Sequence, residues 1–105
     1  MDKKKSIKSK LDYFKRKVSK DIPINKMILF GSRATGKTGK DTDADLIIVS
    51  PVFTKMDFFK RGATMYNYWD LRMPVDFLCY SPEEFKALRK RASIVSTALK
   101  EGIEI

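Results

Sequence analysis

The sequence has 105 residues, which is the length of one domain, and it carries a formal net charge of +9. It contains no His and a single Cys, which excludes Ser-His-Asp and Cys-His nucleophile systems, His-ligated metal sites and an intramolecular disulfide. The sequence shows neither a signal peptide nor an apolar run of the ~20 residues that span a membrane, so we expect a cytoplasmic protein. The positive charge favours an anionic partner such as nucleic acid, a nucleotide or an acidic protein.

The N-terminal segment is rich in lysine and has a helical pattern over residues 3–19. Apolar residues recur at intervals of four, three and four positions and form one stripe: Ile7, Leu11, Phe14 and Val18. We expect this basic amphipathic helix to pack on the domain, with binding to a membrane surface as the alternative. Pro23 ends the helical pattern.

The central part of the chain predicts two strands joined by a glycine-containing loop. Residues 26–30 form a short apolar strand, and residues 43–49 form a second one. The run Leu46-Ile-Ile-Val49 has no polar alternation, which indicates a strand buried on both faces. The connecting loop covers residues 31–41.

A longer helix is predicted over residues 55–72, followed by a strand over residues 75–80. The helix carries an apolar and aromatic stripe that we interpret as core, with an aromatic platform for nucleic-acid bases as the alternative. Its members are Phe58, Gly62, Met65, Trp69 and Met73, with Phe59, Tyr66 and Tyr68 nearby. In the strand, Cys79 lies among apolar residues and is predicted to be a buried thiol.

The C-terminal segment begins with a strong helix-start signal. Ser81 can cap the helix, Pro82 suits its first position and Glu84 completes a capping box. The apolar spacing that follows fits one helix or two short helices meeting near residues 92–93. Gly102 stops the pattern, and a final short strand is predicted over residues 103–105.

The loop contains the letters of a P-loop. Residues 31–38, Gly-Ser-Arg-Ala-Thr-Gly-Lys-Thr, match G-x-x-x-x-G-K-[ST] at each fixed position. A P-loop must lead into a long helix that crosses over to a parallel strand, which takes a dozen or more residues. Only a few residues separate Thr38 from the next strand, so we reject this interpretation.

A carboxylate cluster is the better-supported interpretation. Asp43 and Asp45 are two positions apart at the start of a strand, so their side chains point to one face. Two such carboxylates repel each other unless a cation lies between them, and Mg²⁺ prefers oxygen ligands. Asp76 is the one polar residue in an apolar predicted strand and can supply a third carboxylate if that strand lies beside the second.

Phosphate-binding groups precede these aspartates. Gly31 lets a phosphate approach the backbone, and Ser32 adds a hydroxyl beside the loop amides. Arg33 and Lys37 can neutralise phosphate charge. The sequence therefore places a triphosphate cradle and a carboxylate cluster close together along the chain.

The pattern Gly31-Ser32, ten intervening residues and Asp43-Ala-Asp45 resembles the signature of the polymerase-beta-like nucleotidyltransferases. The surrounding Leu-Phe-Gly-Ser-Arg-Ala and Asp-Thr-Asp-Ala-Asp-Leu are similar to the minimal nucleotidyltransferase (MNT) subfamily. So are Val75-Asp76-Phe-Leu, Ser81-Pro-Glu-Glu-Phe and Lys100-Glu-Gly-Ile103. The resemblance runs from about residue 24 to the C-terminus. Thr42 stands where the family usually has Ser.

This resemblance implies an α/β (α+β) fold with a small mixed β-sheet flanked by helices. One nucleotidyltransferase domain would cover residues 1–105, with a basic helix at 1–20, a catalytic core at 24–80 and a C-terminal helical segment at 81–105. ATP would bind as its magnesium salt at Gly31, Ser32 and Arg33. Asp43, Asp45 and Asp76 would be catalytic and would ligate two Mg²⁺ ions.

The resemblance also implies a partner, because stand-alone members of the subfamily often act as antitoxins of HEPN-domain toxins, and some transfer AMP to a partner's tyrosine. We therefore expect nucleotidyl transfer to a partner protein. The first alternative is a family member that neutralises its partner by contact alone. The second is a nucleic-acid-binding or nucleic-acid-modifying protein, suggested by the charge of +9.

Overall fold

The computed structural model describes residues 3–31, 34 and 43–105. The chain begins with helix α1 (Lys3–Ser19) and strand β1 (Lys26–Phe30), and strand β2 (Ala44–Val49) leads into the short 3-10 helix η1 (Pro51–Lys55). The second half contains α3 (Phe58–Tyr66), β3 (Val75–Tyr80), α4 (Pro82–Arg89), α5 (Ile94–Glu101) and β4 (Ile103–Glu104). The predicted α1, β1, β2, β3 and C-terminal strand are confirmed to within two residues.

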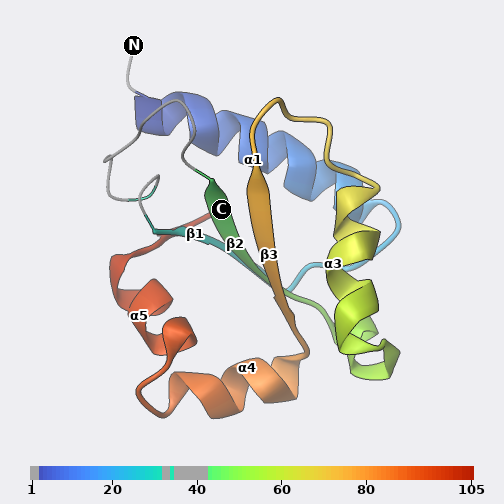
Figure 1. Ribbon diagram of the computed structural model, residues 1–105, viewed down its shortest axis with the longest axis vertical. Coiled ribbons are helices and arrows are strands. Elements are labelled where there is room, and N and C mark those ends of the chain that lie inside the picture. The colour runs from blue at the N-terminus through green and yellow to red at the C-terminus, as the bar shows by residue number, and fades with distance from the viewer. Residues whose placement is uncertain (1–2, 32–33, 35–42) are drawn as a thin grey trace.

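The four strands of the described residues form one mixed sheet in the order β3-β2-β1-β4. β2 and β3 run parallel, whereas β1 is antiparallel to both β2 and β4. Helices cover both faces (Figure 1), which confirms the α+β prediction. The antiparallel pairing of β1 with β2 also supports the rejection of a P-loop, since that motif requires a parallel crossover between its strands.

Two apolar cores lie on opposite faces of the sheet. On one face, α1 packs its stripe of Ile7, Leu11, Phe14 and Val18 against residues that include Met27, Leu29, Leu46 and Ile48. On the other face, α4 and α5 bury Phe85, Val95 and Ala98 against Ile28, Ile47 and Val49. Alternate residues of β2 therefore enter different cores, as expected for a strand buried on both faces. The stripe of α1 is buried within the domain, so the prediction that this helix packs on the sheet is confirmed.

The predicted helix over residues 55–72 is wrong at both ends. Ser50 accepts a hydrogen bond from the Val52 amide and starts η1, and Asp57 caps a separate helix by accepting from the Phe59 amide at 2.9 Å. Because short polar side chains compete for the free amides, they divide the segment into two helices. α3 then ends at Tyr66.

The prediction of an apolar core stripe along α3 is also partly wrong. Met65 is fully buried, but Phe58 is 56% exposed and Phe59 is 86% exposed. The helical spacing therefore identified an apolar face correctly, although part of that face remains uncovered in this chain.

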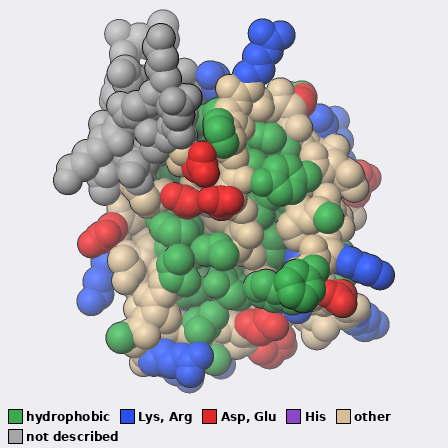
Figure 2. All heavy atoms as spheres, viewed as in Figure 1, with side chains coloured by type: hydrophobic (Ala, Val, Ile, Leu, Met, Phe, Trp, Pro, Cys, Tyr) green, Lys and Arg blue, Asp and Glu red, His purple; other side chains and the backbone are tan. Residues whose placement is uncertain are grey.

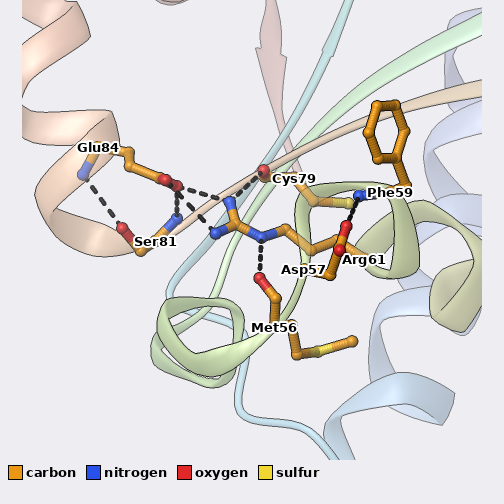
Figure 3. Close-up of polar contacts among 7 residues, drawn as sticks. All are labelled: Met56, Asp57, Phe59, Arg61, Cys79, Ser81 and Glu84. Atoms are coloured by element: carbon orange, nitrogen blue, oxygen red, sulfur yellow. Dashed lines mark hydrogen bonds and ion pairs between the residues drawn. The ribbon is translucent and has the colours of Figure 1, made fainter.

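A buried arginine ties α3 to the start of α4 (Figure 3). The Arg61 guanidinium donates to both Glu84 carboxylate oxygens, at 2.6 and 3.4 Å, and also to the carbonyls of Cys79 and Met56. This charged hydrogen bond lowers the pKa of Glu84, and burial of the carboxyl opposes the shift. Glu84 also accepts from the Ser81 amide and so completes the predicted capping box.

The C-terminal helical segment is two helices. Ser93 caps α5, and its hydroxyl donates to the Leu88 carbonyl at 2.7 Å, so α4 and α5 meet at a tight corner. α5 ends at Glu101 with Gly102 as its C-cap, which confirms the predicted stop. Among the described residues, no helix has the length and apolar character needed to cross a membrane.

Candidate active site

The aspartates meet where β2 and β3 begin. Asp43 directly precedes β2, and Asp45 is its second residue, so the two side chains project from the same face. Asp45 is also the register partner of Asp76 in the parallel β2–β3 pair. Neighbouring strands lie about 4.7–4.9 Å apart, so register partners place their side chains next to each other. The prediction that the third strand brings Asp76 beside the aspartate pair is thus confirmed as a matter of topology.

This acidic group is accessible from outside. Asp43 and Asp76 are exposed and Asp45 is half-buried. Figure 2 shows acidic side chains together over the beginning of these two strands, with hydrophobic side chains around them. They stand on the sheet face that carries α4 and α5, since Ile47 follows Asp45 at two positions and belongs to that core.

Electrostatics links the three carboxylates. The pKa of Asp45 is raised by burial and then by the charges of Asp76 and Asp43. Like charges held close together disfavour ionisation, and a bound cation would reverse this effect. The cluster therefore stabilises a bound cation and repels a nearby anion.

The donor set fits magnesium bound together with a nucleotide. Within the part of the chain that the structure describes, no three His, Cys, Asp or Glu side chains converge as a metal-holding group. Mg²⁺ usually binds through one or two carboxylates and completes its octahedral shell with substrate phosphates and water. The Asp45–Asp76 pair meets that smaller requirement.

Gly31 lies against this cluster. It follows β1 directly, and its φ of +78° is in the region that favours glycine. A Cβ atom at this position would stand 2.5 Å from the Oδ2 atom of Asp45. The Ala34 amide donates to the Gly31 carbonyl at 3.1 Å. Glycine is therefore favoured at position 31 for two structural reasons, its positive φ and the neighbouring carboxylate.

The remaining predicted nucleotide-binding residues, Ser32 and Arg33, lie outside the described residues, as do Lys37 and Thr42. Their part in phosphate binding stays a prediction. Of the candidate site, the structure brings together Gly31, Asp43, Asp45 and Asp76.

Tyr66 is a neighbour of the site that sequence reasoning assigned only to an aromatic stripe. Its hydroxyl donates to the Val75 carbonyl, directly before Asp76. The Pro74 carbonyl accepts from Ala44 in β2, so the next carbonyl points to the free edge of β3. Burial raises the pKa of Tyr66, and the charges of Asp76 and Asp43 raise it further. Tyr66 thus holds Val75, the first residue of β3, which is the strand that carries Asp76.

Comparisons with known proteins agree with this geometry. A family model described as a nucleotidyltransferase domain matches residues 8–105. Curated proteins give no significant match to the chain.

Two solved structures share the fold. One is a candidate nucleotidyltransferase from Sulfolobus solfataricus, with a TM-score of 0.67 and 18% identity over 97% of this chain and 81% of the other. The second is BolA1 from Arabidopsis thaliana, with a TM-score of 0.52 and 18% identity over 70% of this chain and 92% of the other. At this identity the two structures bear on the fold alone.

Proposed function

The chain belongs to the nucleotidyltransferase domain family, and from that premise we propose that it transfers AMP from ATP to a hydroxyl group of a partner protein. The observation that carries the proposal is the parallel register of Asp45 with Asp76, which brings carboxylates from two strands together beside Gly31. A cluster of this kind suits phosphoryl chemistry, where positioning and charge neutralisation supply most of the rate enhancement.

Each candidate site residue that the structure describes has a role in this proposal. Asp43 and Asp45 would hold the magnesium ions of the nucleotide complex, and Asp76 would hold one of them. When bound, Mg²⁺ would neutralise the phosphate oxygens and favour in-line displacement at the α phosphorus. Gly31 has no Cβ atom, which leaves room beside its backbone for the Asp45 carboxylate, and the β and γ phosphates would bind near this position.

The transfer step needs no reactant besides ATP and the acceptor hydroxyl. The acceptor oxygen forms a bond to the α phosphorus while the bond from that phosphorus to the β-phosphate oxygen breaks, and pyrophosphate leaves. Asp76 receives the hydroxyl proton. This carboxylate is exposed, so an acceptor from another molecule can reach it.

We further propose that the acceptor belongs to a HEPN-domain toxin and that the chain acts as its antitoxin, as the resemblance to the MNT subfamily implies. One feature supports a protein acceptor. The exposed Phe58 ring lines a groove together with Tyr80 of β3, whose side chain projects from the same strand face as Asp76.

The test is incubation of the chain with α-labelled ATP, Mg²⁺ and the protein encoded by the adjoining reading frame. We expect label on that protein, and we expect Asp43→Asn and Asp45→Asn to abolish it. Equal labelling by both variants would refute the proposed catalytic site. Neutralisation of the partner without any label would favour the alternative in which the chain acts by contact alone.

A further inference from the structure

Two adjacent phenylalanines are exposed at the start of α3. Phe58 is 56% exposed, Phe59 is 86% exposed, and their ring centroids lie 6.0 Å apart in an edge-on arrangement. In Figure 3 the Phe59 side chain is directed away from the hydrogen-bonded group around Arg61. A fully buried Phe contributes about 1.5–3 kcal/mol relative to an exposed one, so this pair contributes little to the chain's own core. Exposed aromatic side chains that cluster in this way are typical of interaction sites.

A groove begins at Phe58. It encloses about 290 Å³ and is lined by Phe58, Tyr80, Glu84, Ala87, Leu88 and Arg91. On its α4 side, Glu84, Ala87 and Leu88 lie on one face of the helix, and Arg91 follows the end of the helix. Figure 2 shows hydrophobic side chains across the face of the molecule between α3, α4 and the strands. We call this surface the α3–α4 groove.

The walls of the α3–α4 groove are fixed before anything binds. Arg61 in α3 is 5% exposed and binds Glu84 of α4 through both carboxylate oxygens. Its guanidinium also lies 5.6 Å from the centre of the Phe58 ring. A preformed groove lowers the entropy lost on binding, because fewer side chains must be ordered.

The groove also lies on the same strand face as the candidate site. Tyr80 follows Asp76 by four positions along β3, so the two side chains project in the same direction. At about 3.3 Å per residue they are separated by roughly 13 Å. The groove therefore lies roughly two turns of an α-helix away from the carboxylates.

We propose that the α3–α4 groove docks an acidic amphipathic helix of the acceptor protein, whose apolar residues cover Phe58 and Phe59 and whose carboxylates approach Arg91. This proposal rests on the proposed function only in identifying the partner as the acceptor of the transfer reaction. The charge of the chain decides the occupant, because a net charge of +9 attracts an acidic segment and repels a second copy of the same chain. Glu84, the one acid in the groove, is already paired with Arg61 at 2.6 Å.

The first experiment measures binding without any reaction. The probe is a labelled helical peptide with Leu at positions i, i+3, i+4 and i+7 and Glu on its other faces, titrated by fluorescence anisotropy. The same peptide with Lys in place of Glu is the charge control. We expect the acidic peptide to bind, and we expect Phe59→Ser and Arg91→Glu each to weaken it about tenfold or more.

Two variants on the opposite side of the sheet control for general effects. Tyr13→Ser removes another exposed aromatic ring, and Lys10→Glu makes the same change in net charge as Arg91→Glu; both are expected to bind the acidic peptide as the unmodified chain does. Lack of binding by the acidic peptide, or equal effects of the groove variants and their controls, would overturn the proposal. Self-association of the chain that Phe59→Ser abolishes would also overturn it, because the occupant would then be a second copy.

The second experiment separates this proposal from the proposed function. With the adjoining-frame protein as acceptor, we expect Phe59→Ser to raise the KM for that protein and to leave ATP affinity unchanged. Asp45→Asn should abolish labelling and leave the complex intact. Labelling that Phe59→Ser does not alter overturns the docking proposal alone, whereas peptide binding without labelling by the unmodified chain counts against the catalytic function alone.

Discussion

Gly31→Ala is the substitution that probes the close approach of Gly31 to the Asp45 carboxylate. Gly31 has a φ of +78°, and the left-handed region costs an alanine about 1–2 kcal/mol. The added Cβ would also meet Asp45 Oδ2 at 2.5 Å. That oxygen is the end of a rotatable side chain and can move, so we expect the clash to cost little stability and instead to displace the carboxylate.

The expected result has two parts. A loss of about 1–2 kcal/mol corresponds to a fall in Tm of roughly 5–15 °C for a domain of this size, measured by circular dichroism. Displacement of Asp45 should weaken binding of magnesium-ATP about tenfold, or about 1.4 kcal/mol, measured by calorimetry.

Gly62→Ala is the matched control. Gly62 lies within α3, and an added Cβ would meet nothing within 4 Å. Alanine in a helix is about 0.5–1 kcal/mol more favourable than glycine, so the Tm should rise and magnesium-ATP binding should not change. A Gly31→Ala variant that melts at or above the unmodified chain would refute the reasoning, provided that Gly62→Ala gives its expected increase.

Three further predictions concern ionisable and polar side chains. Because burial and the neighbouring carboxylates Asp76 and Asp43 raise the pKa of Asp45 above its ordinary 3.8, the folded chain holds that proton more tightly than the unfolded chain, and the free energy of unfolding falls as pH rises from 3.8 through the raised pKa. In EDTA at neutral pH, Asp45→Asn should therefore have a higher Tm than the unmodified chain, with no gain below pH 3.8, and a lower Tm would contradict this assignment. Arg61→Leu should destabilise the fold by about 1–3 kcal/mol in urea denaturation, because it leaves the Cys79 and Met56 carbonyls without their donor; an unchanged midpoint would show that the network has no net stabilising effect. Burial raises the pKa of the Cys79 thiol to about 12, so a disulfide reagent at pH 8 should modify it only after unfolding, and rapid modification of the folded chain would contradict its burial.

Local sequence signals predicted much of the fold because the relevant physics is local. The stripe of α1 follows from helical spacing, and the start of α4 follows from a serine and a glutamate three residues apart that bond each other's backbone amides. The break between α4 and α5 was left open, since it depends on the bond from the Ser93 hydroxyl to the Leu88 carbonyl.

The exposed end of α3 could not be predicted from spacing. An apolar stripe shows which side of a helix avoids water, but it does not show whether this chain or a partner covers that side. The spacing therefore predicts Phe58 in a core stripe with Phe59 nearby, although both side chains are exposed. The predicted helix over residues 55–72 is divided because the Asp57 side chain caps the start of α3.

Some features of the candidate site could likewise be predicted from the sequence, and others could not. The spacing of Asp43 and Asp45 fixes their common face within one strand. Asp76 required the further assumption that its strand lies beside β2, which the register confirms. The contact of Tyr66 with the Val75 carbonyl has no sequence signature, because a long loop between helix and strand determines where that hydroxyl lies.

The most direct test of the central claim is transfer of label from α-labelled ATP to the adjoining-frame protein in the presence of Mg²⁺. The account predicts label on that protein with the unmodified chain and none with Asp45→Asn, while both chains bind the partner equally. Equal transfer by Asp45→Asn would contradict the assignment of the β2–β3 carboxylates as the catalytic site.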